Sequence, residues 1–175
     1  MKINVIGTSG SGKSTFSRRL AAKLNVPCIE MDTLYWLPDW QGRSDEAMFA
    51  LLEEKLASPG WVLDGNYNRT RHIKWRDVDL VVWLDYGFSR TLYQAVKRAA
   101  TRAWRQMELW PGTGNRESFH RAFFSRESII LWTIKTWRSN RKRYAADMRN
   151  PHYQHVRFVH LNSPREAEAF LASLA

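Results

Sequence analysis

The sequence contains a single cysteine, Cys28, among its 175 residues. One thiol cannot form an internal disulfide, so we expect a fold without disulfides in a reducing cytoplasm. No apolar run approaches the roughly 18 residues of a membrane-spanning helix. The strand expected at residues 2–6 leaves no room for a signal peptide. These absences exclude disulfide scaffolds and predict a protein that makes no contact with membranes.

Acidic residues are also scarce. Asp and Glu total 17 against 27 Lys and Arg, which gives a net charge of +10. The basic residues concentrate in the second half, between Lys97 and Arg149. Such an excess suits two kinds of partner, a nucleic acid or a small ligand with several phosphate groups, and the charge alone does not choose between them.

The sequence does contain a glycine-rich stretch, GTSGSGKS, at residues 7–14. It fits the pattern G-x-x-x-x-G-K-[S/T], in which glycines let successive N–H groups point inward around an anion. In this pattern the lysine reaches the β- and γ-phosphates and the following hydroxyl binds Mg²⁺. A helix beginning near Lys13 adds its positive dipole end. The residues expected to hold the nucleotide phosphates are Gly7, Ser9, Gly10, Ser11, Gly12, Lys13, Ser14 and Thr15, with Ser14 also binding the metal.

Strand-like and helix-like segments alternate along the chain, which is typical of a layered α/β domain. The further strands are expected at residues 28–31, 61–65, 79–85 and 156–160, and the further helices at 44–56, 89–104 and 118–144 and from Ser163 onward. In the helix at 118–144, Ile130, Ile134 and Trp137 are expected on the buried side. Residues 105–117 break the periodicity. We therefore predict one domain over 1–175, a three-layer P-loop fold with five parallel strands and a lid insertion at about 104–118.

Acidic residues follow two of the expected strands. Asp32 follows the second strand and Asp64 ends the third, and the carboxyl ends of parallel strands meet at the ligand-binding edge of a sheet. Asp32 is therefore expected to face the phosphates. Tyr35, Trp36 and Trp40 follow it, and they could stack a planar substrate, line an apolar wall or pack their loop onto the core.

Among P-loop proteins, a GTPase needs an Asn-Lys-x-Asp guanine reader, which is not present in this sequence. A kinase needs a phosphate cradle, an acceptor site and several cations, because phosphoryl transfer is catalysed by positioning and charge neutralisation. Arg138 and Arg141 are three residues apart on an expected helix and so share a face. The basic second half favours the kinase.

Two further stretches carry a resemblance. Residues 61–70, WVLDGNYNRT, resemble the Leu-Asp-Gly-Phe-Pro-Arg segment of adenylate kinases. Together with MDTLYW at 31–36 and the Trp- and Arg-rich second half, they make the whole chain similar to a bacterial group of adenylate-kinase-like P-loop proteins labelled DNA topology modulation (FlaR-related) proteins. The resemblance implies a nucleoside-monophosphate-kinase-like fold with strand order 2-3-1-4-5 and a basic helical lid.

The resemblance also implies roles for individual residues. It places Asp64 where an acid orients Mg²⁺ through water, and Arg69 where an arginine holds the acceptor phosphate. Arg98 corresponds to a lid arginine, and Arg138 and Arg141 to arginines that return from the lid. Gln94 stands where adenylate kinases place an arginine over the adenine, so base stacking from that side is not expected. Pro164 lies in a loop whose backbone flanks the adenine in relatives.

Asp32 departs from the adenylate kinase pattern. It is similar to the aspartate of shikimate, gluconate and dephospho-coenzyme A kinases, which contacts an acceptor hydroxyl and could act as a general base there. Arg69 instead suggests an anionic group, so an acceptor with both a hydroxyl and an anion satisfies both residues. The sequence thus predicts a monomeric or homodimeric kinase that uses ATP and Mg²⁺ on a small-molecule acceptor, a nucleotide or a hydroxylated anionic metabolite. The alternative is an ATP-switched regulator that binds nucleic acid.

Overall fold

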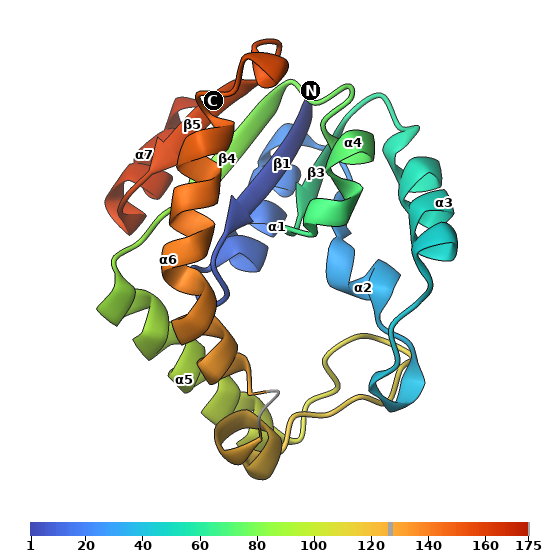
Figure 1. Cartoon of the computed structure of the whole chain (residues 1–175), viewed down its shortest axis with the longest axis vertical. Helices are drawn as coiled ribbons and strands as arrows, with labels where there is room; N and C mark the ends of the chain where they lie inside the picture. The colour runs from blue at the N-terminus through green and yellow to red at the C-terminus, as the bar shows by residue number, and fades with distance from the viewer. Residues whose placement is uncertain (126–127, 175) are drawn as a thin grey trace.

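Five parallel strands form the centre of the computed structural model, which describes residues 1–125 and 128–174. They are β1 (Lys2–Gly7), β2 (Cys28–Glu30), β3 (Trp61–Asp64), β4 (Leu80–Leu84) and β5 (Arg157–Leu161). They pair in the order β2-β3-β1-β4-β5, as predicted (Figure 1). Every residue of β3 and β4 is buried, because helices cover both faces of a parallel sheet.

The helices that surround the sheet are mostly those that the periodicity predicts. They are α1 (Lys13–Leu24), α2 (Met31–Tyr35), α3 (Asp45–Leu56), α4 (Arg71–Lys74), α5 (Phe88–Arg105), α6 (Ile129–Asp147) and α7 (Pro164–Ser173). Short turns occur at η1 (Pro38–Trp40), η2 (Asn68–Thr70), η3 (His120–Phe124) and η4 (Pro151–Tyr153). No helix within residues 1–125 and 128–174 is long and apolar enough to cross a membrane.

The helices form two layers with separate apolar contacts. On one face, Phe16 and Leu20 of α1 and Leu171 of α7 pack against β-strand residues such as Val5. On the other face, helices α2, α3, α4 and α6 supply a second cluster that packs against the sheet (Figure 1). The result is the three-layer α/β architecture that the sequence predicts.

Local capping signals place several helix ends where the sequence predicts them. Asn25 ends α1 in the left-handed region at φ 53°, and the Ser44 hydroxyl accepts from the Ala47 N–H to begin α3. At α7, Ser163 accepts from the Glu166 N–H, and Glu166 accepts from the Asn162 N–H. The two serine bonds satisfy N–H groups that the first turn of each helix leaves unpaired, and the Glu166 bond satisfies the N–H of the residue before the cap.

The single helix predicted over 118–144 is wrong. A π-helical turn covers His120–Phe124, Ser125 is extended at ψ 149°, and α6 begins only at Ile129. Ser128 caps it by accepting hydrogen bonds from the N–H groups of Ile130 and Leu131. A serine in mid-pattern therefore begins a new helix instead of continuing the old one.

The buried side predicted for this helix is also partly wrong. Ile134 is 44% exposed, whereas Thr133, Asn140, Tyr144 and Asp147 are buried. Thr133 and Asn140 contact the phosphate loop, with Thr133 Oγ1 3.5 Å from the Ser9 oxygen. The buried side of α6 carries polar residues because it packs against this loop as well as against apolar strands. The spacing of apolar residues therefore predicted the wrong face of the helix as buried.

Candidate active site

The loop between β1 and α1 has the backbone conformation that its glycines permit. Gly10 has φ +86°, and a Cβ there would lie 2.5 Å from the Thr91 oxygen. A Cβ on Gly7 would lie 2.5 Å from the Leu84 oxygen, which belongs to the neighbouring strand β4. Both positions therefore exclude larger residues. Because α1 begins at Lys13, its first-turn N–H groups are free to bind an anion.

Lys13 lies at the centre of this loop. Its Nζ donates to the Thr8 oxygen at 3.1 Å. Removal from water lowers the pKa of Lys13, and Arg98 lowers it further, while Asp64 and Asp32 act in the opposite direction. Charges act on a pKa over short distances only, so Asp32, Asp64 and Arg98 lie in the neighbourhood of Lys13. The roles of the two aspartates stay predictions.

Ser14 and Asp64 are in contact at the foot of the loop. Burial raises the pKa of the Asp64 carboxylate and outweighs the effects of Lys13 and of the Ser14 hydroxyl, which lies close enough to lower it. Asp64 Oδ1 is buried and has no hydrogen-bond partner in the part of the chain that the structure describes. A hydroxyl and an unsatisfied carboxylate oxygen are hard ligands that fit Mg²⁺. The described residues contain no group of three or more His, Cys, Asp or Glu that could hold a metal without help from a ligand.

Asp32 lies in the first turn of α2, a short helix that was not predicted from the sequence. The Tyr67 hydroxyl donates to Asp32 Oδ1 at 2.7 Å. Burial, followed by the charge of Asp32, raises the pKa of this hydroxyl, so Tyr67 remains a donor. The role of Tyr67 was not predicted either, because only the fold brings its loop beside α2.

Arg98 reaches the phosphate loop from α5. Its Nη2 lies 3.0 Å from Ser9 Oγ. Burial, followed by Arg102, lowers the pKa of Arg98, while Asp32 and Glu117 raise it. Arg102 and the buried Glu117 belong to the same cluster, and neither was predicted from the sequence. The spacing of four residues from Arg98 on one helix face is the signal that could have identified Arg102.

Arg69 points toward α3. Its Nη1 pairs with Asp45 Oδ1 at 3.1 Å, and its guanidinium lies 4.8 Å from the Tyr35 ring centroid. Tyr35 in turn contacts the Tyr67 ring, with centroids 5.5 Å apart. Arg69 is thus connected to Asp32 through two tyrosines and lies at the outer wall of the same region.

The two arginines of α6 have different surroundings. Arg141 Nε pairs with Asp85 Oδ1 at 2.8 Å, at the end of β4, and its guanidinium stacks on Trp137. Arg138 is exposed and forms no ion pair with any of the described residues. The structure does not bring either arginine into contact with the phosphate loop, and their transfer role stays a prediction.

The remaining predicted nucleotide contacts surround the loop. Ser11 is buried, and its Oγ has no hydrogen-bond partner among the described residues. Thr15 is exposed in the first turn of α1. Pro164 is the first residue of α7, after β5, which is separated from β1 by β4 alone. Their contacts with a nucleotide stay predictions.

The segment that follows α5 packs across the site onto residues 36–42 (Figure 1). Trp110 stacks on Trp36 with ring centroids 5.2 Å apart, and it meets Trp40 edge-on at 5.6 Å. The buried Asn115 accepts from the Trp40 N–H at 3.0 Å and donates to the Leu37 oxygen at 2.8 Å. Of the uses open to Trp36 and Trp40, the structure supports packing, here against the segment predicted as a lid.

The strand order, the glycine-rich loop after β1 and the helices on both faces define the fold of P-loop kinases. No protein-family model matches the sequence, and no curated protein matches it. Among solved structures, the crystal structure of a gluconokinase from Sinorhizobium meliloti 1021 resembles it with a TM-score of 0.50 and 21% identity, over 99% of this chain and 93% of that chain. This likeness establishes the fold.

Proposed function

We propose that this protein is a kinase that transfers the γ-phosphoryl group of ATP to a small-molecule acceptor carrying a hydroxyl and an anionic group. The proposal is supported above all by the convergence of Lys13, the Ser14–Asp64 pair and Asp32 around one loop. These residues supply a phosphate cradle, a metal site and a candidate base within one cluster. The gluconokinase likeness is consistent with this class of reaction.

The donor nucleotide binds with its phosphates in the loop at residues 7–14. Lys13 and Arg98 neutralise the oxygens of the transferred group, which is where the negative charge of phosphoryl transfer lies. Ser14 and Asp64 would hold Mg²⁺, which when bound neutralises charge on the β- and γ-phosphates. Arg98 donates to Ser9 Oγ at 3.0 Å, so its guanidinium lies beside the loop that would hold the phosphates.

The acceptor lies beside Asp32. Tyr67 fixes the carboxylate through Oδ1, so Oδ2 can accept the proton of the acceptor hydroxyl. The resulting oxygen attacks the γ-phosphorus, the bond to the β–γ bridging oxygen breaks, and ADP leaves with that electron pair. Arg102 and Arg69 are the cations available to hold an anionic group on the acceptor. The proton on Asp32 returns to solvent after release.

The test is a screen for ADP production from ATP, and in parallel for GDP production from GTP, with nucleosides, nucleotides and hydroxylated acids as acceptors. We expect Lys13→Ala to abolish turnover and Asp32→Asn to keep ATP binding but lose transfer. Asp77→Asn serves as the matched control, because this aspartate pairs with Arg76 at the surface. Phosphoryl transfer that survives in both site variants contradicts the roles assigned to Lys13 and Asp32, and no turnover of the native chain with any acceptor contradicts the kinase assignment.

A second candidate is an ATP-switched regulator that binds single-stranded nucleic acid. It is favoured by exposed rings beside basic residues, with Trp104 80%, Phe124 79% and Trp132 60% exposed. Rings of this kind stack on bases while arginines and lysines contact phosphates. Such binding weakens steeply with salt. No affinity for DNA or RNA at roughly 0.1 M salt would exclude this candidate.

A further inference from the structure

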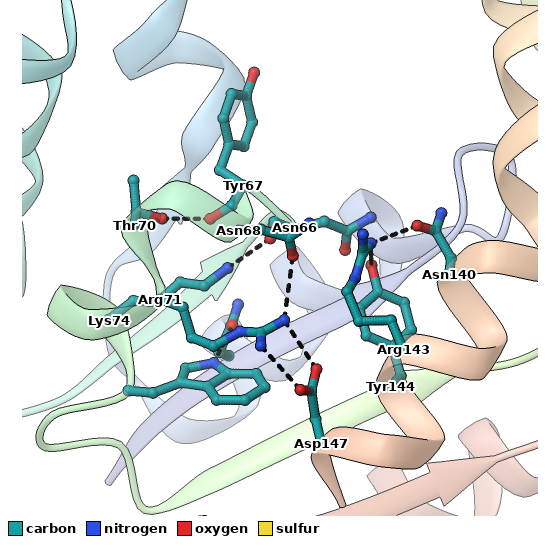
Figure 2. A network of polar contacts seen from close by, with 12 residues as sticks. Asn66, Tyr67, Asn68, Thr70, Arg71, Lys74, Asn140, Arg143, Tyr144 and Asp147 are labelled. Carbon is teal, nitrogen blue, oxygen red and sulfur yellow. Dashed lines mark hydrogen bonds and ion pairs between the residues drawn. The ribbon is translucent and has the colours of Figure 1, made fainter.

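A buried lysine outside the predicted site is hydrogen-bonded to the turn that follows Asp64. Lys74, the last residue of α4, is 1% exposed. Its Nζ donates to the Gly65 oxygen at 3.2 Å. It also donates to the Asn66 oxygen at 3.0 Å, and both of these residues are drawn in Figure 2. Both acceptors belong to the turn that follows Asp64. A buried amino group that is bonded to two backbone carbonyls therefore holds the turn between β3 and η2.

This turn is connected to the phosphate loop by Asn66. The Asn66 Oδ1 accepts from the Gly7 N–H at 3.0 Å, and its Nδ2 donates to the Gly7 oxygen at 2.6 Å. β3 ends at Asp64, which is paired with Val5, so it does not reach Gly7. The carboxamide of Asn66 takes the place of the missing strand and satisfies both peptide groups of the first loop residue.

The same turn is also connected to the acceptor side. A Cβ on Gly65 would lie 2.5 Å from the Met31 side chain, so Gly65 and the first residue of α2 are in tight contact. Met31 immediately precedes Asp32. The turn held by Lys74 therefore touches both the phosphate loop and the helix that carries the candidate base.

The surroundings of Lys74 are mostly positive. Arg71 forms an ion pair with Asp147, Arg143 lies on the facing side of α6, and burial is the main reason that the pKa of Lys74 falls to about 7 (Figure 2). Removing a charged group from water without a carboxylate in contact is costly. An apolar residue would fill the same space without this desolvation cost. The presence of a lysine therefore indicates that its hydrogen bonds to the turn matter at this position.

We propose that Lys74 is a positioning residue for nucleotide binding, which acts by fixing the Gly65–Asn66 turn so that the Asn66 carboxamide holds Gly7. The inference rests on the proposed nucleotide site. Lys74 touches no reacting group in this scheme, and its effect passes through Asn66. Its loss therefore loosens the entrance of the phosphate loop and weakens nucleotide binding.

The experiment measures the Kd of Mg·ADP by calorimetry, well below the melting temperature, for Lys74→Met, Asn66→Ala and the double variant. We expect each single variant to weaken binding about tenfold, the scale of losing a charge-assisted or paired hydrogen bond. The double variant should lose little more than one single variant, because both act on one connection. Arg76→Met, an exposed neighbour, should leave the Kd unchanged.

Two results would overturn the proposal. One is a Lys74→Met variant with a lower Tm but an unchanged Kd, which is the result of a purely structural role. The other is additive losses in the double variant. Should Lys74→Met not fold, unchanged Mg·ADP binding in Asn66→Ala overturns the proposal by itself, because the effect of Lys74 is routed through Asn66.

Hydrogen exchange of the Gly7 amide tests the connection without any nucleotide. We expect its protection to fall in both Lys74→Met and Asn66→Ala and to persist in Arg76→Met. If the native chain binds no nucleotide, the proposed function fails, and the exchange data still decide whether Lys74 controls Gly7. Protection that persists in Lys74→Met overturns the positioning role.

Discussion

Charged side chains around the phosphate loop are partly removed from water, with Asp64 buried and Lys13 and Arg98 half-buried. Burial shifts the pKa of Lys13 and Arg98 downward and that of Asp64 upward. Each shift means that the charged form is solvated less well than it would be in water. A bound triphosphate and its metal would restore this solvation with opposite charges. The residues of the site are therefore arranged to interact strongly with a charged ligand.

Lys74 should give stability a distinct dependence on pH. Its pKa is about 7 in the folded chain against the ordinary lysine value of 10.5, so between these values the unfolded state binds more protons. The free energy of unfolding then rises with pH from about 7 to 10.5 as far as this group contributes. Urea unfolding at several pH values measures the free energy of unfolding of the native chain and of Lys74→Met. We expect the native value to rise relative to that of the variant over this pH range. A pH-independent difference contradicts the prediction.

Asp85 should be a second residue on which stability depends. Its side chain is 2% exposed and accepts from Arg141 Nε at 2.8 Å and contacts His160 Nε2 at 2.9 Å. Asp85→Asn replaces the carboxylate that these two partners contact with a neutral carboxamide. We expect the unfolding free energy to fall by about 1–3 kcal/mol. Urea unfolding measures it, with exposed Asp77→Asn as the control. A loss no larger than that of the control would show that the Asp85 contacts contribute little.

At the scale of elements, the segments 106–118 and 36–42 pack against each other. Their contact combines the Trp110–Trp36 stack with two hydrogen bonds of Asn115. Trp36 directly follows α2, the helix that carries Asp32. These contacts join the helix that carries the candidate base to the segment that was predicted as a lid.

Removing the Trp110 ring should weaken this connection. An aromatic pair contributes about 0.5–1.5 kcal/mol beyond its area, so we expect Trp110→Ala to raise the KM for the acceptor by about 2- to 13-fold. Steady-state kinetics measures the change. Trp104→Ala is the matched control, because this ring is 80% exposed and lies on α5 outside the aromatic contact. Equal effects of both substitutions would argue against a role of the contact in acceptor binding.

At the scale of the whole molecule, ligand binding should be visible as stability. A ligand at about 100 times its Kd stabilises the folded state by about 2.7 kcal/mol. In a domain of this length that corresponds to a rise in Tm of roughly 5–11 °C. We expect Mg·ATP to produce such a rise in the native chain, a smaller one when EDTA removes the metal, and none in Lys13→Ala. An equal rise in Lys13→Ala would place nucleotide binding elsewhere.

Much of the fold follows from local patterns in the sequence. The apolar runs of β3 and β4, the Asn25 helix end and the Ser163 cap are signals carried by a few neighbouring residues. The glycine-rich loop is a signal of the same kind. These predictions are confirmed because each rests on backbone geometry and capping that need no distant partner.

The wrong predictions occur where contacts with residues distant in the sequence determine which side chains are buried and where a helix begins. Ile134 matches an apolar stripe, yet it is 44% exposed, because the face of α6 carrying Thr133 and Asn140 packs against the phosphate loop. The break before Ile129 depends on Ser128, whose role as a cap was not distinguishable from a polar position in a longer helix. Periodicity reports which residues share a face, and it does not report what that face will meet.

The sequence by itself determined the loop at residues 7–14, the five strands and the presence of Asp32 and Asp64 after two of them, because glycine conformations, apolar runs and strand ends are local properties. Only the tertiary structure decided that Tyr67 donates to Asp32, that Asn66 bonds Gly7 and that Lys74 bonds the turn carrying Asn66. These contacts join residues from separate elements, and their energies arise from burial and hydrogen bonding that exist only once the sheet has assembled.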